Sequence, residues 1–450
     1  MAETLIAAGR IVPTASALHD SPRARVGQSG IISPGYVLLR DGYIAAVGEG
    51  RAPRAPDVHI SSGVLAPGFV DLQVNGYFGA ELDAVRPAGW RMVASRLPET
   101  GTTAFMPTFI TAPIAQLTEA LRVASRLAPA LEFAAPPIPP VPPGTAANAQ
   151  EDKDPGAAGN TQGGEDLRAA VSAQAAEGRR AGGGAAGARV LGVHLEGPFI
   201  SPLRAGAHNK DWMIEPSAEA VDQLLDAGSG ILRIVTLAPE LPGALEAASR
   251  LAAAGVVVSV GHSDATASQV SAAVGAGARM VTHLFNAQRP LHHREAGVVG
   301  QALSDPRLVS GLVADFGHVA RAVCAIAFAA APGRICLVTD AAACAGMPPG
   351  EYMLGGEPIE LPAGDGVPPV RADGTLAGSA LRMDVAVANM VSAGASLPEA
   401  IAAATRIPAD LIGRPELGRI APGALADLAW LDDDLRTRAT WVAGELVYTR

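Results

Sequence analysis

Three residues of this chain, Glu196, His262 and His283, have the types and positions expected of metal ligands. Each lies in or directly after a short apolar run that reads as a buried strand. One carboxylate with two imidazoles is a usual ligand set for a catalytic metal ion that keeps one position open for water. Taken singly, each residue is more typical of a hydrogen-bonded core histidine or a loop acid. Three such positions at the ends of separate strands favour a metal site.

A further carboxylate, Asp340, ends the apolar run 335–339. A divalent cation lowers the pKa of a water that it binds from ~15.7 to ~7, and it polarises a carbonyl oxygen. Asp340 is then placed to accept the proton of that water as a general base and to return it to the leaving group as a general acid. The four residues together therefore predict a hydrolytic site at which water attacks a carbonyl carbon.

The elements that must position these residues alternate between apolar strands and alanine-rich helices. Eight such units are typical of a TIM barrel, whose chemistry lies at the carboxyl ends of its strands. In that fold His318 and Asp315 join the other candidates at the same rim. A doubly wound open sheet is the alternative, but no Gly-x-Gly-x-x-Gly turn follows an early strand. The expected strands are 68–74, 104–109, 190–195, 231–237, 256–260, 280–284, 309–314 and 335–339, and the expected helices include 114–127, 218–225, 244–254, 267–276 and 320–330.

Both ends of the chain have a different pattern, with short strands separated by turns such as Asp41-Gly42 and Gly444-Glu445. We expect segments 1–65 and 415–450 to form one small β-sandwich domain beside a barrel of residues 66–414. Residues 136–164 are rich in proline, glycine and small residues, and we expect them to form a disordered insertion because they hold hardly any large apolar side chain.

Bulk composition narrows the classes of partner. The 450 residues are 49% hydrophobic and 17% charged, with a formal net charge of −10, which argues against nucleic acid or an anionic membrane as the main partner. No signal peptide or membrane-length apolar run is visible. The three cysteines have no CxxC spacing, so we expect reduced thiols and a cytoplasmic location.

Six motifs along residues 60–385 resemble those of the N-acetylglucosamine-6-phosphate deacetylases of the amidohydrolase superfamily. The motifs are PGFVDLQVNG at 67–76, HLEGPF at 194–199, GHS at 261–263, THLFNA at 282–287, LVTDA at 337–341 and GTLAGS at 374–379. The resemblance implies hydrolysis of N-acetylglucosamine 6-phosphate to glucosamine 6-phosphate and acetate, in amino sugar catabolism or recycling. In this reaction a water on the metal attacks the acetyl carbonyl with Asp340 as general base and acid.

The same resemblance suggests roles for residues around the metal. His208 would hold the acetyl carbonyl oxygen, and His318 would contact the sugar. Asn286, the backbone of Ala287 and Arg294 would hold the phosphate, which suits the planar fork of an arginine. The family's arginine crosses a dimer interface, so we expect a homodimer in which Arg294 reaches the neighbouring site. An alternative for Arg294 is a salt bridge with Glu295 or Glu351.

The metal count follows from the first motif. Many members of the superfamily carry His-x-His there for a second metal, whereas this chain has Gln73-x-Asn75. A neutral amide is a poor ligand for a zinc-type ion, so we expect one divalent metal ion per subunit: zinc, with iron, cobalt or manganese as alternatives.

Two departures from the family pattern concern the sugar pocket: Phe316-Gly317 precedes His318 where the family more often has glycine first, and Gln288 replaces a common methionine. Two other functions therefore stay open. One is a related amidohydrolase acting on N-acetylgalactosamine 6-phosphate or another N-acyl substrate. The other is a catalytically inactive barrel scaffold, which a metal analysis would distinguish.

Overall fold

The computed structural model describes residues 3–14, 30–82, 87–127, 187–364 and 366–450. The expected disordered insertion at 136–164 lies outside the described residues.

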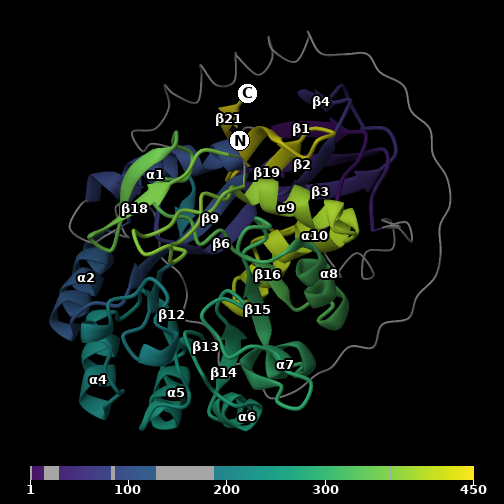
Figure 1. The fold of residues 1–450 in the computed structure, drawn as a ribbon. Coiled ribbons are helices and arrows are strands. Elements are labelled where there is room, and N and C mark those ends of the chain that lie inside the picture. The colour runs from purple at the N-terminus through teal and green to yellow at the C-terminus, as the bar shows by residue number, and fades with distance from the viewer. Residues whose placement is uncertain (1–2, 15–29, 83–86, 128–186, 365) are drawn as a thin grey trace.

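A barrel of eight parallel strands forms the centre of the molecule (Figure 1). Strand β6 pairs with β9, and the order then runs β9-β11-β12-β13-β14-β15-β16. A parallel bridge between Val74 and Ala341 joins the two ends of this sheet. The predicted TIM barrel is therefore confirmed. Its strands are β6 (Phe69–Val74), β9 (Thr102–Ile110), β11 (Val193–Glu196), β12 (Leu232–Leu237), β13 (Val257–Val260), β14 (Ala278–Val281), β15 (Val309–Leu312) and β16 (Ile335–Leu337).

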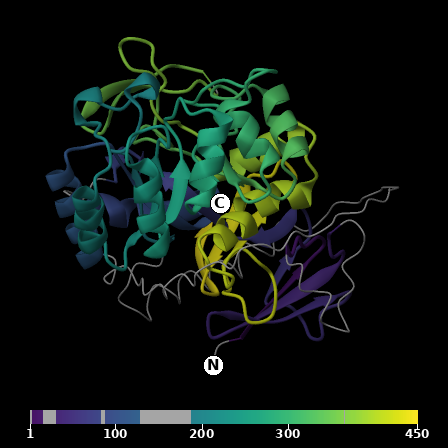
Figure 2. The ribbon, with the colours of Figure 1, turned by 90° about the horizontal axis from the view of Figure 1, so that it is seen from below.

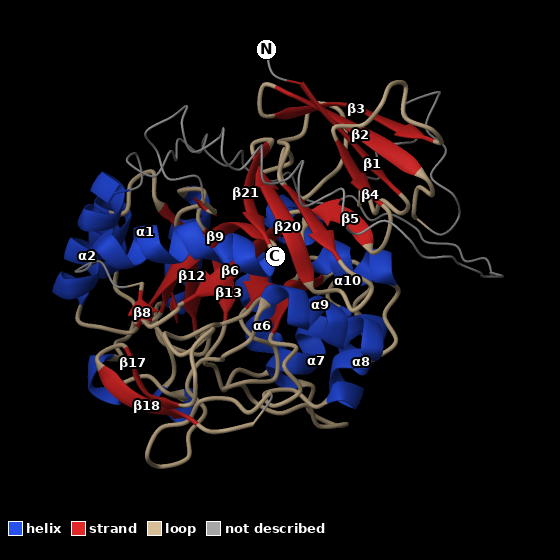
Figure 3. Ribbon diagram, turned by 90° about the horizontal axis from the view of Figure 1, so that it is seen from above, coloured by secondary structure: helices blue, strands red, loops and turns tan. Residues whose placement is uncertain are grey.

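Helices surround the barrel (Figures 1 and 3), and their buried apolar residues share one core with those of the strands. Helix α2 shows the pattern, because its buried residues Leu117, Leu121 and Ala124 recur every three or four positions. Among the described residues, no helix is both long and apolar enough to span a membrane. The helices are α1 (Pro87–Arg96), α2 (Ile114–Leu127), α4 (Ala218–Ala227), α5 (Ala244–Ala253), α6 (Ala267–Gly275), α7 (Gly297–Ser304), α8 (Arg321–Ala330), α9 (Met383–Ser392), α10 (Leu397–Ala404) and α11 (Arg406–Leu411).

Two four-stranded sheets from the chain ends lie beside the barrel (Figures 2 and 3); the second is antiparallel throughout, and the first is antiparallel except for a parallel pairing of β1 with β4. The first has the order β3-β2-β1-β4, and the second has β21-β20-β19-β5. They bury a common core that includes Ile6, Leu65 and Trp441, which is the expected small sandwich. The strands are β1 (Glu3–Ala8), β2 (Gly35–Arg40), β3 (Tyr43–Glu49), β4 (Val58–Ile60), β5 (Val64–Pro67), β19 (Leu428–Leu431), β20 (Thr437–Val442) and β21 (Glu445–Thr449). The domain limits at 65/66 and 414/415 stay predictions, since β5 runs across the first of them.

Buried carboxylates join the sandwich to the barrel. Asp427, just before β19, accepts two hydrogen bonds at 3.2 Å from the guanidinium of Arg189 at the foot of the barrel. Asp384 in α9 accepts from Arg382 at 2.8 Å and from the backbone N–H of Thr437 in β20 at 3.1 Å. These contacts hold the C-terminal strands against a barrel whose opposite rim carries the candidate site.

The expected third strand is divided into two pieces. Residues Arg189–Val190 (β10) pair with β9, and the barrel strand proper, β11, begins only at Val193. Gly192 between them has a φ of 128°, which places its backbone outside the strand region and explains the break.

A hairpin that the sequence interpretation did not include covers part of the rim. It consists of β17 (Gly350–Leu354) and β18 (Glu357–Leu361), joined by Gly355-Gly356. A Gly-Gly pair between two short apolar runs is a recognised hairpin signal, so this element was readable from the sequence.

Candidate active site

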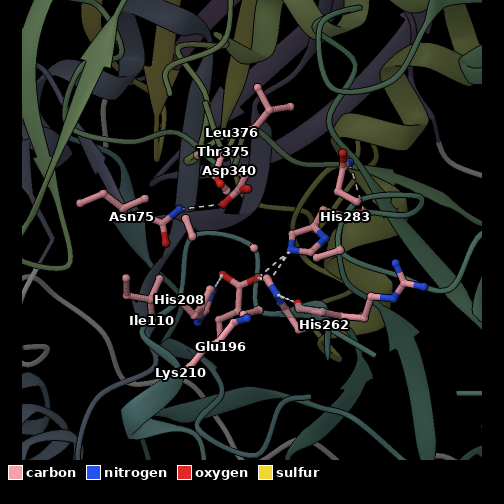
Figure 4. A pocket seen from close by; sticks show the side chains of 18 of the residues that line it. Asn75, Ile110, Glu196, His208, Lys210, His262, His283, Asp340, Thr375 and Leu376 are labelled. Atoms are coloured by element: carbon pink, nitrogen blue, oxygen red, sulfur yellow. Dashed lines mark hydrogen bonds and ion pairs between the residues drawn. The ribbon is translucent and has the colours of Figure 1, made fainter. Parts of the chain in front are cut away.

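One pocket at the carboxyl ends of the barrel strands brings together most of the predicted site residues (Figure 4). It encloses about 510 Å³, a volume within the usual range for a small-molecule site. The predicted residues that line it are Glu196, His208, His262, His283, Asn286, Ala287, His318 and Asp340. Arg294 is exposed and does not line this pocket; its Nη1 lies 2.6 Å from Nε2 of the neighbouring His293.

Glu196, His262 and His283 converge on a single point. Oε1 of Glu196 lies 2.8 Å from Nε2 of His283 and 3.1 Å from Nε2 of His262, and the two Nε2 atoms are 3.1 Å apart. All three side chains are at least 94% buried. The residues come from the ends of β11, β13 and β14, so the parallel barrel places their donor atoms together.

The protonation of His262 tests whether this group suits a cation. Nδ1 of His262 lies 2.9 Å from the carbonyl oxygen of Arg204, which only accepts hydrogen bonds, so Nδ1 carries the proton. In the neutral ring Nε2 then directs a lone pair at the carboxylate of Glu196. Two acceptors at this distance require a proton or a cation between them. The donor set therefore fits a divalent metal ion of the zinc type.

The pKa shifts of this group have the same origin. Burial by itself would raise the pKa of Glu196, but its hydrogen bonds with His262 and His283 hold that pKa well below its usual value. Burial would lower the pKa of His283, yet the hydrogen bond and charge of Glu196 raise it to about 9. A strongly anionic carboxylate that attracts a proton onto a neighbouring imidazole will also attract a metal ion.

His208 lies beside the same carboxylate in a different role. Its Nε2 is 3.8 Å from Oε2 of Glu196, and distance alone would allow Glu196, His208 and His262 to share a metal ion. However, the backbone N–H of Thr111, which can only donate, lies 3.3 Å from Nδ1 of His208, so Nδ1 accepts, and it then also accepts from the hydroxyl of Thr111 at 2.8 Å. Burial, reinforced by His262, keeps the pKa of His208 well below its ordinary value, so the ring is neutral. Its proton therefore sits on Nε2, which offers an N–H donor to the pocket.

Asp340 follows β16 and is held by the side chains of Gln73 in β6 and of Asn75, the residue after β6. Asn75 Nδ2 and Gln73 Nε2 donate to Oδ1 of Asp340 at 2.7 and 3.1 Å. Burial, together with the negative charge of Glu196, raises the pKa of Asp340 to about 6. A carboxyl group with such a pKa can both accept and release a proton near neutral pH.

His318 is oriented by Asp315 on the loop after β15. The Nδ1 of His318 lies 2.6 Å from Oδ2 of Asp315, and the backbone N–H groups of Gly317 and His318 donate to Oδ1 of the same carboxylate. This arrangement presents the opposite edge of the imidazole ring to the pocket. The sequence predicts both residues at the rim but not their contact.

Four pocket residues have backbone conformations that are rare for residues other than glycine. The φ angles of His262, His283, Ala287 and Asp340 are 47°, 29°, 48° and 51°. β14 stops at Val281 and β16 at Leu337, short of the expected 284 and 339, and the positive φ of His283 and of Asp340 turns the chain just beyond each strand end. Such conformations cost free energy and cluster at functional sites, where they aim side chains.

Several lining residues escaped the sequence interpretation. Ile110, Leu354 and Leu376 form an apolar wall, whereas Asp373, Thr375 and Lys210 add polar groups at the mouth. Leu354 comes from the unpredicted hairpin, and Thr375 and Leu376 lie in the GTLAGS motif, which was used for the resemblance and not for the site. The quoted motif was therefore the signal for two of them.

Known proteins resemble this chain in sequence along most of its length. Residues 64–447 match the amidohydrolase family. The chain is 36% identical over 398 residues to the N-acetylglucosamine-6-phosphate deacetylase of Bos taurus, covering 86% of this chain and 83% of that protein. It is 42% identical over 266 residues to the N-acetylgalactosamine-6-phosphate deacetylase of Escherichia coli O157:H7, covering 58% of this chain and 70% of that protein.

Among solved structures, a variant of the N-acetyl-D-glucosamine-6-phosphate deacetylase of Mycobacterium smegmatis in complex with N-acetyl-D-glucosamine-6-phosphate superposes on the whole chain. Its TM-score is 0.79 at 30% sequence identity, and the alignment covers 100% of both chains.

Proposed function

We propose a deacetylase function for this chain, which belongs to the amidohydrolase family. The reaction is hydrolysis of N-acetylglucosamine 6-phosphate to glucosamine 6-phosphate and acetate. The observation that carries the proposal is the convergence of a buried carboxylate, two imidazoles, a neutral imidazole N–H donor and a carboxyl group of raised pKa on one pocket.

The family implies a divalent metal ion. Glu196, His262 and His283 would hold it, and we favour a single zinc ion, with iron, cobalt or manganese as alternatives. Such an ion supplies Lewis acidity: it polarises the acetyl carbonyl and makes a water nucleophilic near neutral pH.

The protein's own groups would carry the rest of the reaction. Nε2–H of His208 donates to the acetyl oxygen as negative charge develops there, which is the usual function of an oxyanion donor. Asp340 accepts a proton from the attacking water and delivers it to the sugar nitrogen as the C–N bond breaks. Acetic acid and the free amine are then the two products, the acid ionises to acetate by releasing the second proton of the water to solvent, and Asp340 ends in its starting state.

The rest of the substrate would be held farther from the reacting carbon. His318, oriented by Asp315, contacts the sugar. Asn286 and the backbone of Ala287 contact the phosphate. Because Arg294 is exposed and does not line the pocket of its own chain, we propose that it serves the phosphate site of a partner subunit in a homodimer.

A second substrate has support of its own. The relative that acts on the galactosamine epimer is 42% identical over its aligned part, above the 36% of the mammalian glucosamine enzyme. The two epimers differ only at one hydroxyl group of the sugar, so the ligands of the metal do not distinguish them. The lining residues near the pocket mouth would.

One assay tests these proposals together. Acetate release is measured with N-acetylglucosamine and N-acetylgalactosamine, each with and without the 6-phosphate. We expect hydrolysis of the phosphorylated glucosamine derivative with the highest kcat/KM. Preference for the galactosamine epimer would make that sugar phosphate the substrate, and no acetate release from any of the four by metal-loaded protein would overturn the function.

The three free, buried cysteines agree with the cytoplasmic location that we propose.

A further inference from the structure

Oδ1 of Asp340 receives two amide hydrogen bonds from the carboxyl end of β6, one from Gln73 in the strand and one from Asn75 directly after it. Asn75 Nδ2 donates at 2.7 Å and Gln73 Nε2 at 3.1 Å, and the first of these contacts is visible in Figure 4. No described residue donates to the other oxygen, Oδ2. The carboxyl group is thus held at one oxygen and free at the other.

The two donors are both buried. Gln73 and Asn75 are 0% and 6% exposed, and both side chains point at the same oxygen of Asp340. Gln73 Nε2 also donates to Oε1 of Glu196 at 3.2 Å, so one amide group links the proposed metal ligand to Asp340.

The main chain around Asp340 is fixed separately from its side chain. The backbone N–H of Asp340 donates to the carbonyl of Gln73 at 2.9 Å, and the backbone N–H of Asn75 donates to the carbonyl of Ala341 at 2.8 Å. These contacts keep Asp340 beside β6. They leave rotation of its carboxyl group to be set by the two side-chain amides.

Each amide that donates to Asp340 has an oxygen without a partner in the described part of the chain, which lowers the stability of the folded state. Gln73 Oε1 and Asn75 Oδ1 are buried and have no hydrogen-bond partner among the described residues. A buried acceptor without a donor destabilises the folded state. Gln288 is a buried amide in the same region with both ends bonded, because it donates to the carbonyl of Thr282 and accepts from the N–H of Phe285. Stability therefore does not explain Gln73 and Asn75.

We propose that Gln73 and Asn75 are positioning residues that hold Oδ1 of Asp340 and reserve Oδ2 for proton transfer. An amide N–H is a donor at every pH, so it holds the same oxygen while Asp340 gains and loses its proton. A histidine at either position would titrate or bind metal. The inference rests on the proposed deacetylation and adds a reason for the Gln-x-Asn pattern.

The test uses Gln73→Leu and Asn75→Leu, which keep the approximate size and remove the donors. We expect kcat to fall about 10–100-fold in each, as for other residues that orient catalytic groups, with little change in KM and unchanged metal content. The melting temperature should stay the same or rise. Gln288→Leu is the matched control, and its melting temperature should fall. Loss of metal or of stability in both Gln73→Leu and Asn75→Leu would assign the two residues a structural role and overturn the inference.

A double-mutant cycle separates action through Asp340 from independent action. In an Asp340→Asn background, Asn75→Leu should cause no further loss of kcat. Multiplicative losses would overturn the inference. Crystal structures of the two single variants give a readout without activity: the carboxyl group of Asp340 should rotate. If it keeps its orientation in both, the inference fails even when the protein is a deacetylase; if the parent protein releases no acetate, the proposed function fails instead.

Discussion

Nε2 of His262 and Nε2 of His283 face each other at 3.1 Å, and both face Oε1 of Glu196. Since Nδ1–H of His262 is committed to the carbonyl oxygen of Arg204, its Nε2 brings a lone pair to this meeting point. Three electron-rich atoms so close together are held by a proton on His283 or by a cation that replaces it.

The first prediction concerns metal content. We expect one divalent cation per chain and its loss in Glu196→Gln, because an amide is a weaker ligand than a carboxylate. Elemental analysis measures this directly, and a chelator should lower the melting temperature of the parent protein because bound metal stabilises the folded state. Glu246→Gln, on the exposed face of α5, serves as the control and should keep its metal. Two ions per chain would contradict the argument from Gln73 and Asn75.

Asp340→Asn should remove most of the turnover and leave the metal in place. An amide cannot accept the proton of water, and general acid–base groups contribute ~10²–10⁴-fold to rate. The change is measured as kcat at saturating substrate, with metal content and melting temperature as checks on the fold. Near-normal turnover would transfer the proton-transfer role to His318, which Asp315 already orients.

Arg294→Ala should raise KM for the phosphorylated sugar and hardly affect the unphosphorylated one, since only the former loses a charged partner. The subunit that Arg294 serves is identified by mixing Arg294→Ala with Asp340→Asn. One site of each hybrid dimer would combine an intact Asp340 with the partner's intact arginine, so activity at low substrate should partly return. If hybrids form and activity does not return, Arg294 serves its own subunit and the shared-site proposal is wrong.

Asp71 predicts a pH dependence of stability. Its carboxyl group accepts from the hydroxyl and backbone N–H of Thr339, but it is 1% exposed, and burial raises its pKa to about 7 from the ordinary value of 3.8. Between these values the folded protein binds a proton that the unfolded chain does not. The contribution of Asp71 to the free energy of unfolding is therefore present at low pH and is lost as pH rises from about 4 to 7. The loss is on the order of 4 kcal/mol.

The measurement compares melting temperatures of the parent protein and Asp71→Asn, an isostere of the protonated form, between pH 5 and 8. The melting temperature of Asp71→Asn should rise relative to that of the parent protein as pH rises. Asp226→Asn, at an exposed position of α4, should run parallel to the parent. A constant difference between the parent and Asp71→Asn would show that Asp71 is ionised throughout this range.

The sequence alone predicted the barrel and the small terminal sandwich, but its interpretation missed the hairpin of β17 and β18 and the break in the third strand. Apolar runs alternating with alanine-rich segments predicted the barrel, and turns such as Asp41-Gly42 predicted the terminal sheets. These signals are local, because burial of a strand or one face of a helix leaves its period in consecutive residues. Polar residues at strand ends then predicted a common rim, since parallel strands of a barrel all end on one side.

Roles within the site needed the tertiary structure. His208 and His262 are the same residue type in the sequence. Only the contact of His262 with Arg204 and that of His208 with Thr111 show that Nε2 carries a lone pair in His262 and a proton in His208. The clamp on Asp340 joins residues 265 and 267 positions apart, and Arg294 proved to lie away from its own pocket. Sequence patterns record whether a residue is buried and in which element it lies. The protonation and direction of a side chain depend on single atoms that the fold brings from other strands, and no local pattern encodes them.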